Sequence, residues 1–118
     1  VKLENLDALD NLEELYLSHN GISKMEGLLN LKRLRLLDLG NNRIENIEQV
    51  DQLQELQELW INNNKLEDFD DLKLITHLKH IDTVYLEGNP LYQDGEYQNK
   101  VMSYIPHLKQ LDAVPVTR

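Results

Sequence analysis

Two stretches of the sequence share one pattern: LKRLRLLDLGNN at residues 31–42 and LQELQELWINNN at residues 53–64. In both, leucine occupies the first, fourth and seventh positions, leucine or isoleucine the ninth, and asparagine the twelfth. The two stretches begin 22 residues apart. Self-similarity at a fixed period of about 20–50 residues is typical of chains built from stacked structural units.

The pattern continues outward in both directions. One period earlier, residues 9–20 read LDNLEELYLSHN, and residues 78–89 read LKHIDTVYLEGN. The last copy starts 25 residues after its predecessor because an extra apolar triplet around Ile75 comes before it. After each asparagine, apolar residues recur at every third position: Ile22, Met25 and Leu28; Ile44, Ile47 and Val50; Leu66, Phe69 and Leu72.

Each copy therefore has two parts. The alternating Leu-x-Leu stretch indicates a short strand, while the spacing of three favours a 3₁₀ or helical turn. One copy cannot bury its own leucines, so neighbours must stack and their strands must form a parallel sheet. The sequence predicts an α/β fold: a right-handed leucine-rich-repeat solenoid of 22-residue repeats, with the parallel sheet on its concave face and the 3₁₀ or helical segments on its convex side.

The two ends of the chain depart from the repeat. After Pro90 the pattern stops, and residues 97–104 read as a helix that Ile105-Pro106 ends. We expect this segment and residues 108–112 to form a C-terminal cap over the last repeat. At the other end, Leu3 and Leu6 match Met25 and Leu28, so the chain opens inside a repeat.

These ends define the expected domain organisation. We expect one leucine-rich-repeat domain over residues 1–118, in which residues 1–91 hold a partial first repeat and four further repeats and residues 92–118 form the cap. The opening inside a repeat suggests the C-terminal part of a longer repeat protein.

The recurring asparagine has a structural explanation. It stands where each strand ends and the chain turns, and its side-chain amide can satisfy backbone groups that the bend leaves without partners. We expect four such structural residues: Asn20, Asn42, Asn64 and Asn89.

Charge and composition narrow the class of partner. The chain has 12 lysines and arginines against 21 aspartates and glutamates, a formal net charge of −9. This balance argues against nucleic acid or an anionic membrane and favours a protein with a basic contact surface. The chain has no cysteine and no apolar run of membrane-spanning length. We expect a monomer inside the cell, in the nucleus, the cytoplasm or both.

The residues between the strand leucines must project from the concave face, because side chains alternate along a strand. The middle position of successive strands holds Tyr16, Asp38, Trp60 and Tyr85. Aromatic residues that the repeat turns toward solvent have no core to fill, and tryptophan and tyrosine are enriched at interface hot spots. The alternative is that the rings only stiffen the sheet as cross-strand neighbours.

Carboxylates accompany these rings, and no lysine or arginine stands among the strand positions of this face. The sequence thus predicts an acidic, aromatic protein-binding surface. Its expected contact residues are Asp38, Glu58, Trp60, Tyr85, Tyr16, Glu14 and Glu87.

Patterns of catalytic and metal sites give little support for an enzyme. His77 and His80 stand three residues apart, but no further histidine or cysteine supplies a third ligand at a recognised spacing. The acidic run at residues 68–71 lacks the register of a calcium loop. We expect no metal, no cofactor and no catalytic residue.

Three stretches carry a family resemblance: ELYLSHNGI at residues 14–22, LQELWIN at residues 56–62 and TVYLEGNPL at residues 83–91. With the cap residues, they make nearly the whole chain similar to the C-terminal part of the leucine-rich-repeat regulatory subunit of type-1 serine/threonine protein phosphatase. The resemblance implies an intracellular scaffold whose concave face grips the phosphatase catalytic subunit. It also implies contact positions at Asp38, Glu58, Trp60 and Tyr85, with Tyr16 in the same column.

Another reading keeps the fold and changes the partner. Related capped repeat stacks resemble adaptors of splicing, dynein or chromatin machinery, which would bind a helix or loop of another intracellular protein. A joint requirement for Glu58 and Trp60 in the contact would separate the two.

Overall fold

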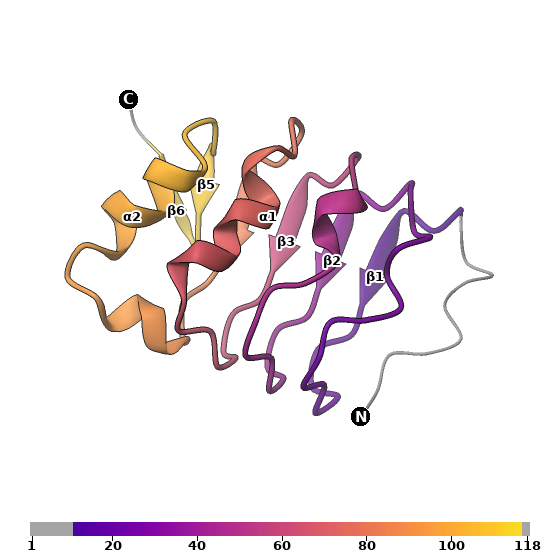
Figure 1. Ribbon diagram of the computed structural model, residues 1–118, viewed down its shortest axis with the longest axis horizontal. Coiled ribbons are helices and arrows are strands. Elements are labelled where there is room, and N and C mark those ends of the chain that lie inside the picture. The colour runs from indigo at the N-terminus through magenta and orange to yellow at the C-terminus, as the bar shows by residue number, and fades with distance from the viewer. Residues whose placement is uncertain (1–10, 117–118) are drawn as a thin grey trace.

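The computed structural model describes residues 11–116, which form one six-stranded sheet with the strands in sequence order (Figure 1). The first five strands are parallel to one another, and β6 pairs with β5 in the antiparallel direction. The strands are β1 (Glu14–Tyr16), β2 (Leu36–Asp38), β3 (Glu58–Trp60), β4 (Thr83–Tyr85), β5 (Gln110–Leu111) and β6 (Val114–Pro115).

All helical segments lie on one side of this sheet (Figure 1). Neighbouring strands are spaced about 4.8 Å apart, whereas packed helices need about 8–10 Å, so the stack bends with the strands on its concave face. The segments are the 3₁₀ helices η1 (Val50–Gln52), η2 (Phe69–Leu72) and η3 (Pro90–Gln93) and the α-helices α1 (Lys73–Thr76) and α2 (Tyr97–Tyr104).

The predicted leucine-rich-repeat solenoid and its cap helix are confirmed, with differences on the convex side. The convex segment of residues 21–30 is a turn closed by the hydrogen bond from Leu31 N to Leu28 O, 3.0 Å long, rather than a helix. The extra triplet before the last repeat is used to form α1, which buries Ile75. The expectations that concern Leu3, Leu6 and Leu9 fall on residues outside the described range.

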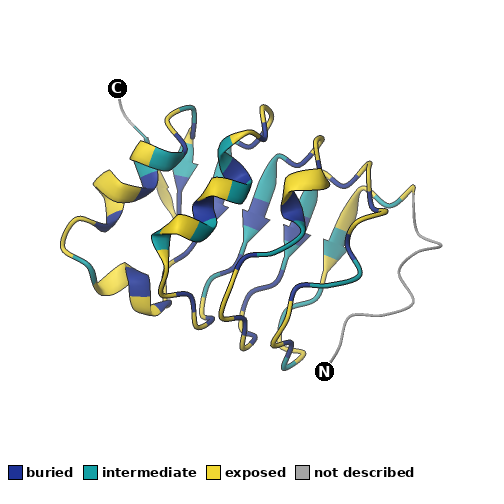
Figure 2. Cartoon of the chain, viewed as in Figure 1, coloured by how far each residue is buried: buried dark blue, intermediate teal, exposed yellow. Residues whose placement is uncertain are grey.

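The repeating apolar residues form one continuous core between the sheet and the convex segments (Figure 2). Strand residues Leu37, Leu59 and Val84 are fully buried, whereas Leu15 in β1 is only partly buried. Burying a leucine or isoleucine contributes about 1.5–3 kcal/mol relative to leaving it exposed, so stacking of the repeats is the main source of stability.

The asparagines run along the inside of the turns that follow the strands. The Oδ1 atom of Asn42 accepts hydrogen bonds from Asn20 N and Ile22 N, at 2.9 and 3.0 Å. Its Nδ2 atom donates to Leu17 O and Leu39 O, at 3.1 and 2.9 Å. Asn64 and Asn89 make equivalent contacts, and each is buried. Each amide therefore joins the turn of its own repeat to the turn of the preceding one.

A left-handed residue stands just before each of these asparagines. His19, Asn41 and Asn63 have φ values of 60°, 57° and 57°, and Gly88 has 80°. Glycine and asparagine adopt this conformation at low cost. A Cβ atom on Gly88 would lie only 2.0 Å from Oδ1 of Asn63, so this turn requires glycine for space as well as for conformation.

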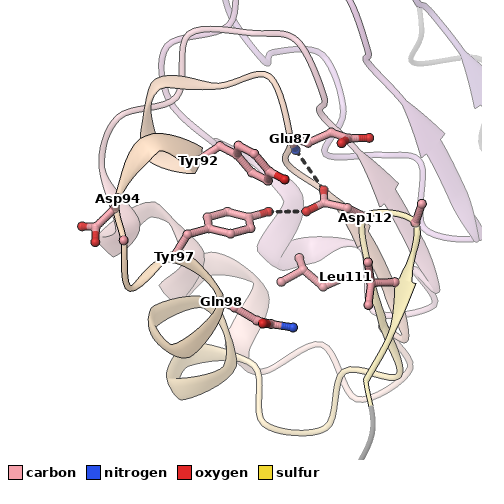
Figure 3. Close-up of a pocket in the computed structure, with 10 residues that line it drawn as sticks. Glu87, Tyr92, Asp94, Tyr97, Gln98, Leu111 and Asp112 are labelled. Carbon is pink, nitrogen blue, oxygen red and sulfur yellow. Dashed lines mark hydrogen bonds between the residues drawn. The ribbon is translucent and has the colours of Figure 1, made fainter.

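The cap ends the sheet through a buried carboxylate (Figure 3). In the repeats, the backbone amides after each strand donate to carbonyl groups of the next repeat. After β4, Oδ1 of Asp112 accepts instead from Leu86 N at 2.6 Å and Glu87 N at 2.9 Å. Its Oδ2 atom accepts from the Tyr97 hydroxyl on α2, 2.7 Å away. Asp112 thus replaces the carbonyl groups of a further repeat.

Candidate protein-binding face

The register of the parallel strands aligns the middle residues of β1 to β4 into one column. Tyr16 pairs with Asp38, Asp38 with Trp60, and Trp60 with Tyr85. These side chains project away from the buried leucines, onto the face that carries no helix. We call this set, Tyr16, Asp38, Trp60 and Tyr85, the central column.

The rings of the central column pack edge to face. The centroid of Trp60 lies 5.6 Å from that of Tyr85, with the ring planes at 82°. The Trp60 ring also reaches across β2 to Tyr16, at 6.3 Å and 69°. Edge-to-face pairs add about 0.5–1.5 kcal/mol beyond the area they bury, so the three rings hold one another in place. Tyr16 remains 55% exposed.

Two carboxylates orient these rings. The hydroxyl of Tyr16 donates to Oε1 of Glu14 at 2.8 Å, and Nε1 of Trp60 is 3.3 Å from Oε1 of Glu58. The hydrogen bond to Glu14, with a smaller contribution from desolvation, raises the pKa of Tyr16 above its usual value. The Tyr16 hydroxyl therefore remains a neutral donor near neutral pH.

Negative charge accumulates on this face without compensation. Within residues 11–116, the ion pairs are Arg35–Glu13, Lys73–Asp70 and Lys100–Asp94, and none involves a carboxylate of the concave face. One oxygen of Asp38 accepts from Gly40 N at 3.0 Å. Glu14 and Glu87 are exposed at opposite ends of the face. Such a surface is electrostatically complementary to a basic partner.

Sequence reasoning missed one residue of this face. Gln110 in β5 is in register with Thr83, and its Nε2 atom is 3.1 Å from the hydroxyl oxygen of Tyr85. The signal was the spacing of Leu108 and Leu111, which repeats that of the strand leucines. Because no asparagine follows them, residues 108–112 were assigned to the cap without a strand.

The residues considered for metal binding have other surroundings. His77 and His80 are exposed on the turn that leads to β4. Asp68 caps η2 by accepting from Asp70 N at 2.9 Å. Among residues 11–116, no group of three or more histidine, cysteine, aspartate or glutamate side chains is placed to hold a metal ion. In the same range, no helix is long and apolar enough to cross a membrane.

A second hollow, of about 440 Å³, lies in the cap between η3, α2 and β5 (Figure 3). The rings of Tyr92 and Tyr97 pack edge to face there, with centroids 4.7 Å apart. Burial, and next the hydrogen bond to Asp112, raises the pKa of Tyr97 far above its usual range. Because Asp94 is paired with Lys100 at 2.6 Å and Asp112 accepts three hydrogen bonds, the polar groups of this hollow serve the cap itself.

The chain belongs to the leucine-rich-repeat family, because the profile of that family matches residues 1–117. A 43-residue stretch is 50% identical to protein phosphatase 1 regulatory subunit 7 from Danio rerio and, separately, to that from Homo sapiens. A 46-residue stretch is 41% identical to protein phosphatase 1 regulatory subunit SDS22 from Schizosaccharomyces pombe.

These matches cover a limited part of both sequences. The human and zebrafish matches span 36% of this chain and 12% of the relative, and the yeast match spans 37% and 14%. The resemblance that the sequence suggested over nearly the whole chain is therefore supported over about a third of it.

Solved structures extend the likeness to the whole fold. The chain aligns with the crystal structure of the Drosophila melanogaster SNF/U2A' complex at a TM-score of 0.90 and 28% identity, over 99% of this chain and 69% of the other. It aligns with an internalin from Listeria monocytogenes at a TM-score of 0.74 and 26% identity, over 96% and 31% of the two chains.

Proposed function

We propose that this protein is a non-catalytic scaffold that binds the catalytic subunit of a type-1 protein phosphatase through its concave face. The observation that carries the proposal is the central column, in which solvent-facing rings are held by one another and by carboxylates. Preorganised aromatic side chains lose little conformational entropy on binding, which is why they act as hot spots. The regulatory subunits that match part of the chain support the choice of partner.

The seven residues of the proposed contact are Glu14, Tyr16, Asp38, Glu58, Trp60, Tyr85 and Glu87. Trp60 is central among them because it touches two other rings and lies beside Glu58. The partner would offer lysine or arginine to the carboxylates and an apolar surface to the rings. Both proteins would meet inside the cell, in the nucleus or the cytoplasm.

The test is a calorimetric titration of the phosphatase catalytic subunit with the wild-type chain and with Trp60→Ala. Truncating the ring should weaken binding by about 2 kcal/mol or more, while circular dichroism shows an unchanged fold. Leu29→Ala is the matched control, since Leu29 is also exposed, at 46%, but lies outside the sheet. Equal affinity of wild type and Trp60→Ala would rule out the concave face as the contact.

A second candidate is an adaptor that binds a helix or loop of a different intracellular protein. The observation that favours it is the alignment with the SNF/U2A' complex, which covers 99% of this chain. A folded wild-type chain that ignores the phosphatase but captures another partner, with loss of capture in both Glu58→Ala and Trp60→Ala, would support the adaptor.

A further inference from the structure

The edge of the sheet where the strands begin carries a group of basic side chains that the concave face does not use. Lys79, His80, His107 and Lys109 surround one hollow of about 380 Å³. We call these four residues the basic ledge. They come from two turns that precede β4 and β5, and these turns are joined by hydrogen bonds from Lys109 N and Gln110 N to Asp82 O, each 2.9 Å long.

The turns are neighbours along one edge of the molecule (Figure 1). Because they lie on the rigid stack, the ledge is presented by ordered backbone. His107 is fixed further by a 3.0 Å contact between its Nε2 atom and Leu78 O. The spacing of the four basic groups is therefore set by the fold, although three of the side chains are exposed.

The positive charge of the ledge is not neutralised by the protein itself. Lys73, Lys100 and Arg35 each pair with a carboxylate, whereas none of the four ledge residues makes an ion pair within the described part of the chain. The one acidic residue that lines the hollow, Asp82, accepts from the Thr83 hydroxyl at 2.9 Å. A basic hollow thus persists on a chain whose formal net charge is −9.

We propose that the basic ledge binds a phosphorylated, acidic segment of a protein. A phosphomonoester carries a charge of about −1.5 to −2 at neutral pH and three strong acceptor oxygens. Two lysines and two histidines around one hollow match that charge better than they match a single carboxylate. The ledge has lysines rather than arginines, and lysine binds phosphate as a point charge without the planar fork that favours carboxylates.

The rest of the surface favours a peptide over a nucleic acid. A nucleic acid would bring successive phosphates past the ledge and against the acidic faces of the chain, whereas one phosphorylated side chain meets only the basic hollow. Gln57, which lies beside Glu58 of the concave face, also lines the hollow. A protein held on the concave face could therefore extend a segment onto the ledge.

The experiment measures fluorescence anisotropy of a labelled acidic peptide that carries one phosphoserine, with the full chain at low salt. The double variant Lys79→Gln/Lys109→Gln should bind about tenfold more weakly, since each lysine supplies a charge-assisted contact. The matched control is Lys24→Gln/Lys65→Gln, which removes the same charge from two other exposed positions and should change the affinity less than about twofold.

Further arms separate the alternatives. The unphosphorylated peptide should bind about tenfold more weakly than the phosphorylated one. Equal losses in the ledge and control variants would overturn the site. Inorganic phosphate that competes as well as the phosphopeptide, or a single-stranded RNA oligomer that binds the ledge more tightly, would overturn the assignment to a peptide. Trp60→Ala should leave the peptide affinity unchanged, so the outcome is independent of the proposed phosphatase contact.

Discussion

At the scale of single residues, the asparagines show how one side chain can stabilise a turn and a stack together. The amide of Asn42 contacts backbone groups of two successive repeats and is buried, whereas Asn20 is exposed and its Nδ2 atom reaches only Leu17 O and Ser18 O. A buried backbone group that loses its partner costs more than an exposed one, which water can satisfy.

We therefore predict that Asn42→Ala lowers the free energy of unfolding by about 1–3 kcal/mol. Asn20→Ala should cost less, because solvent replaces its hydrogen bonds. Urea unfolding followed by circular dichroism measures both variants. Equal losses for the two, or a wild-type midpoint for Asn42→Ala, would show that the buried ladder contacts contribute little.

Asp71 makes a second prediction at this scale. Partial burial, and less strongly the charges of Asp68, Glu48 and Asp70, raise the pKa of Asp71, although its hydrogen bond from Ile47 N acts in the opposite direction. A raised carboxyl pKa means that the fold favours the protonated form, so the ionised form destabilises the protein above that pKa.

Asp71→Asn keeps an oxygen for the Ile47 amide and removes the charge. We expect it to stabilise the protein at pH 7 by up to about 0.5 kcal/mol, a small value because solvent screens a group on the surface. The gain should vanish as the pH falls through the carboxyl range, where Asp71 itself is protonated. Thermal melts across pH measure this, with Glu45→Gln as the charge-matched control. A gain that persists in acid would contradict the electrostatic explanation.

At the scale of elements, the cap joins α2 to the sheet through Asp112. Tyr97→Phe removes the hydroxyl that donates to Oδ2 of this buried carboxylate. We expect a loss of about 1–3 kcal/mol in the free energy of unfolding. Tyr92→Phe is the control, because its ring packs against Tyr97 but remains 42% exposed, and it should change stability by less than about 0.5 kcal/mol. Similar losses in both variants would indicate that the rings alone hold the cap.

The cap also marks the limit of prediction from this sequence. The 22-residue period predicted the strands and hence the alignment of Tyr16, Asp38, Trp60 and Tyr85, because register follows from a constant repeat length. The period breaks after Asn89, so Gln110 and Asp112 could not be placed by counting. The reach of Trp60 across β2 to Tyr16 depends on side-chain rotamers, which no repeat pattern specifies.

At the scale of the whole molecule, charge is divided between two surfaces. The concave face carries carboxylates without ion pairs in residues 11–116, while the basic ledge lies at the edge where the same strands begin. A partner on the concave face would meet a negative centre and a positive rim. Long-range attraction to the acidic centre speeds encounter and weakens as salt screens it over a Debye length of about 10 Å at 0.1 M.

This division yields a prediction for the proposed phosphatase contact. Glu58→Lys should weaken binding of the catalytic subunit by about tenfold or more at low salt, because it places like charge opposite a basic surface and removes the acceptor beside Trp60. The remaining affinity should depend less steeply on salt than that of wild type. Glu45→Lys, a charge reversal outside the sheet, should have little effect on either quantity. Calorimetry at several salt concentrations, with a thermal melt of each variant, makes the comparison. If Glu58→Lys lost the same affinity at every salt concentration and also melted early, the loss would reflect misfolding, and the electrostatic role of the concave face would have to be abandoned.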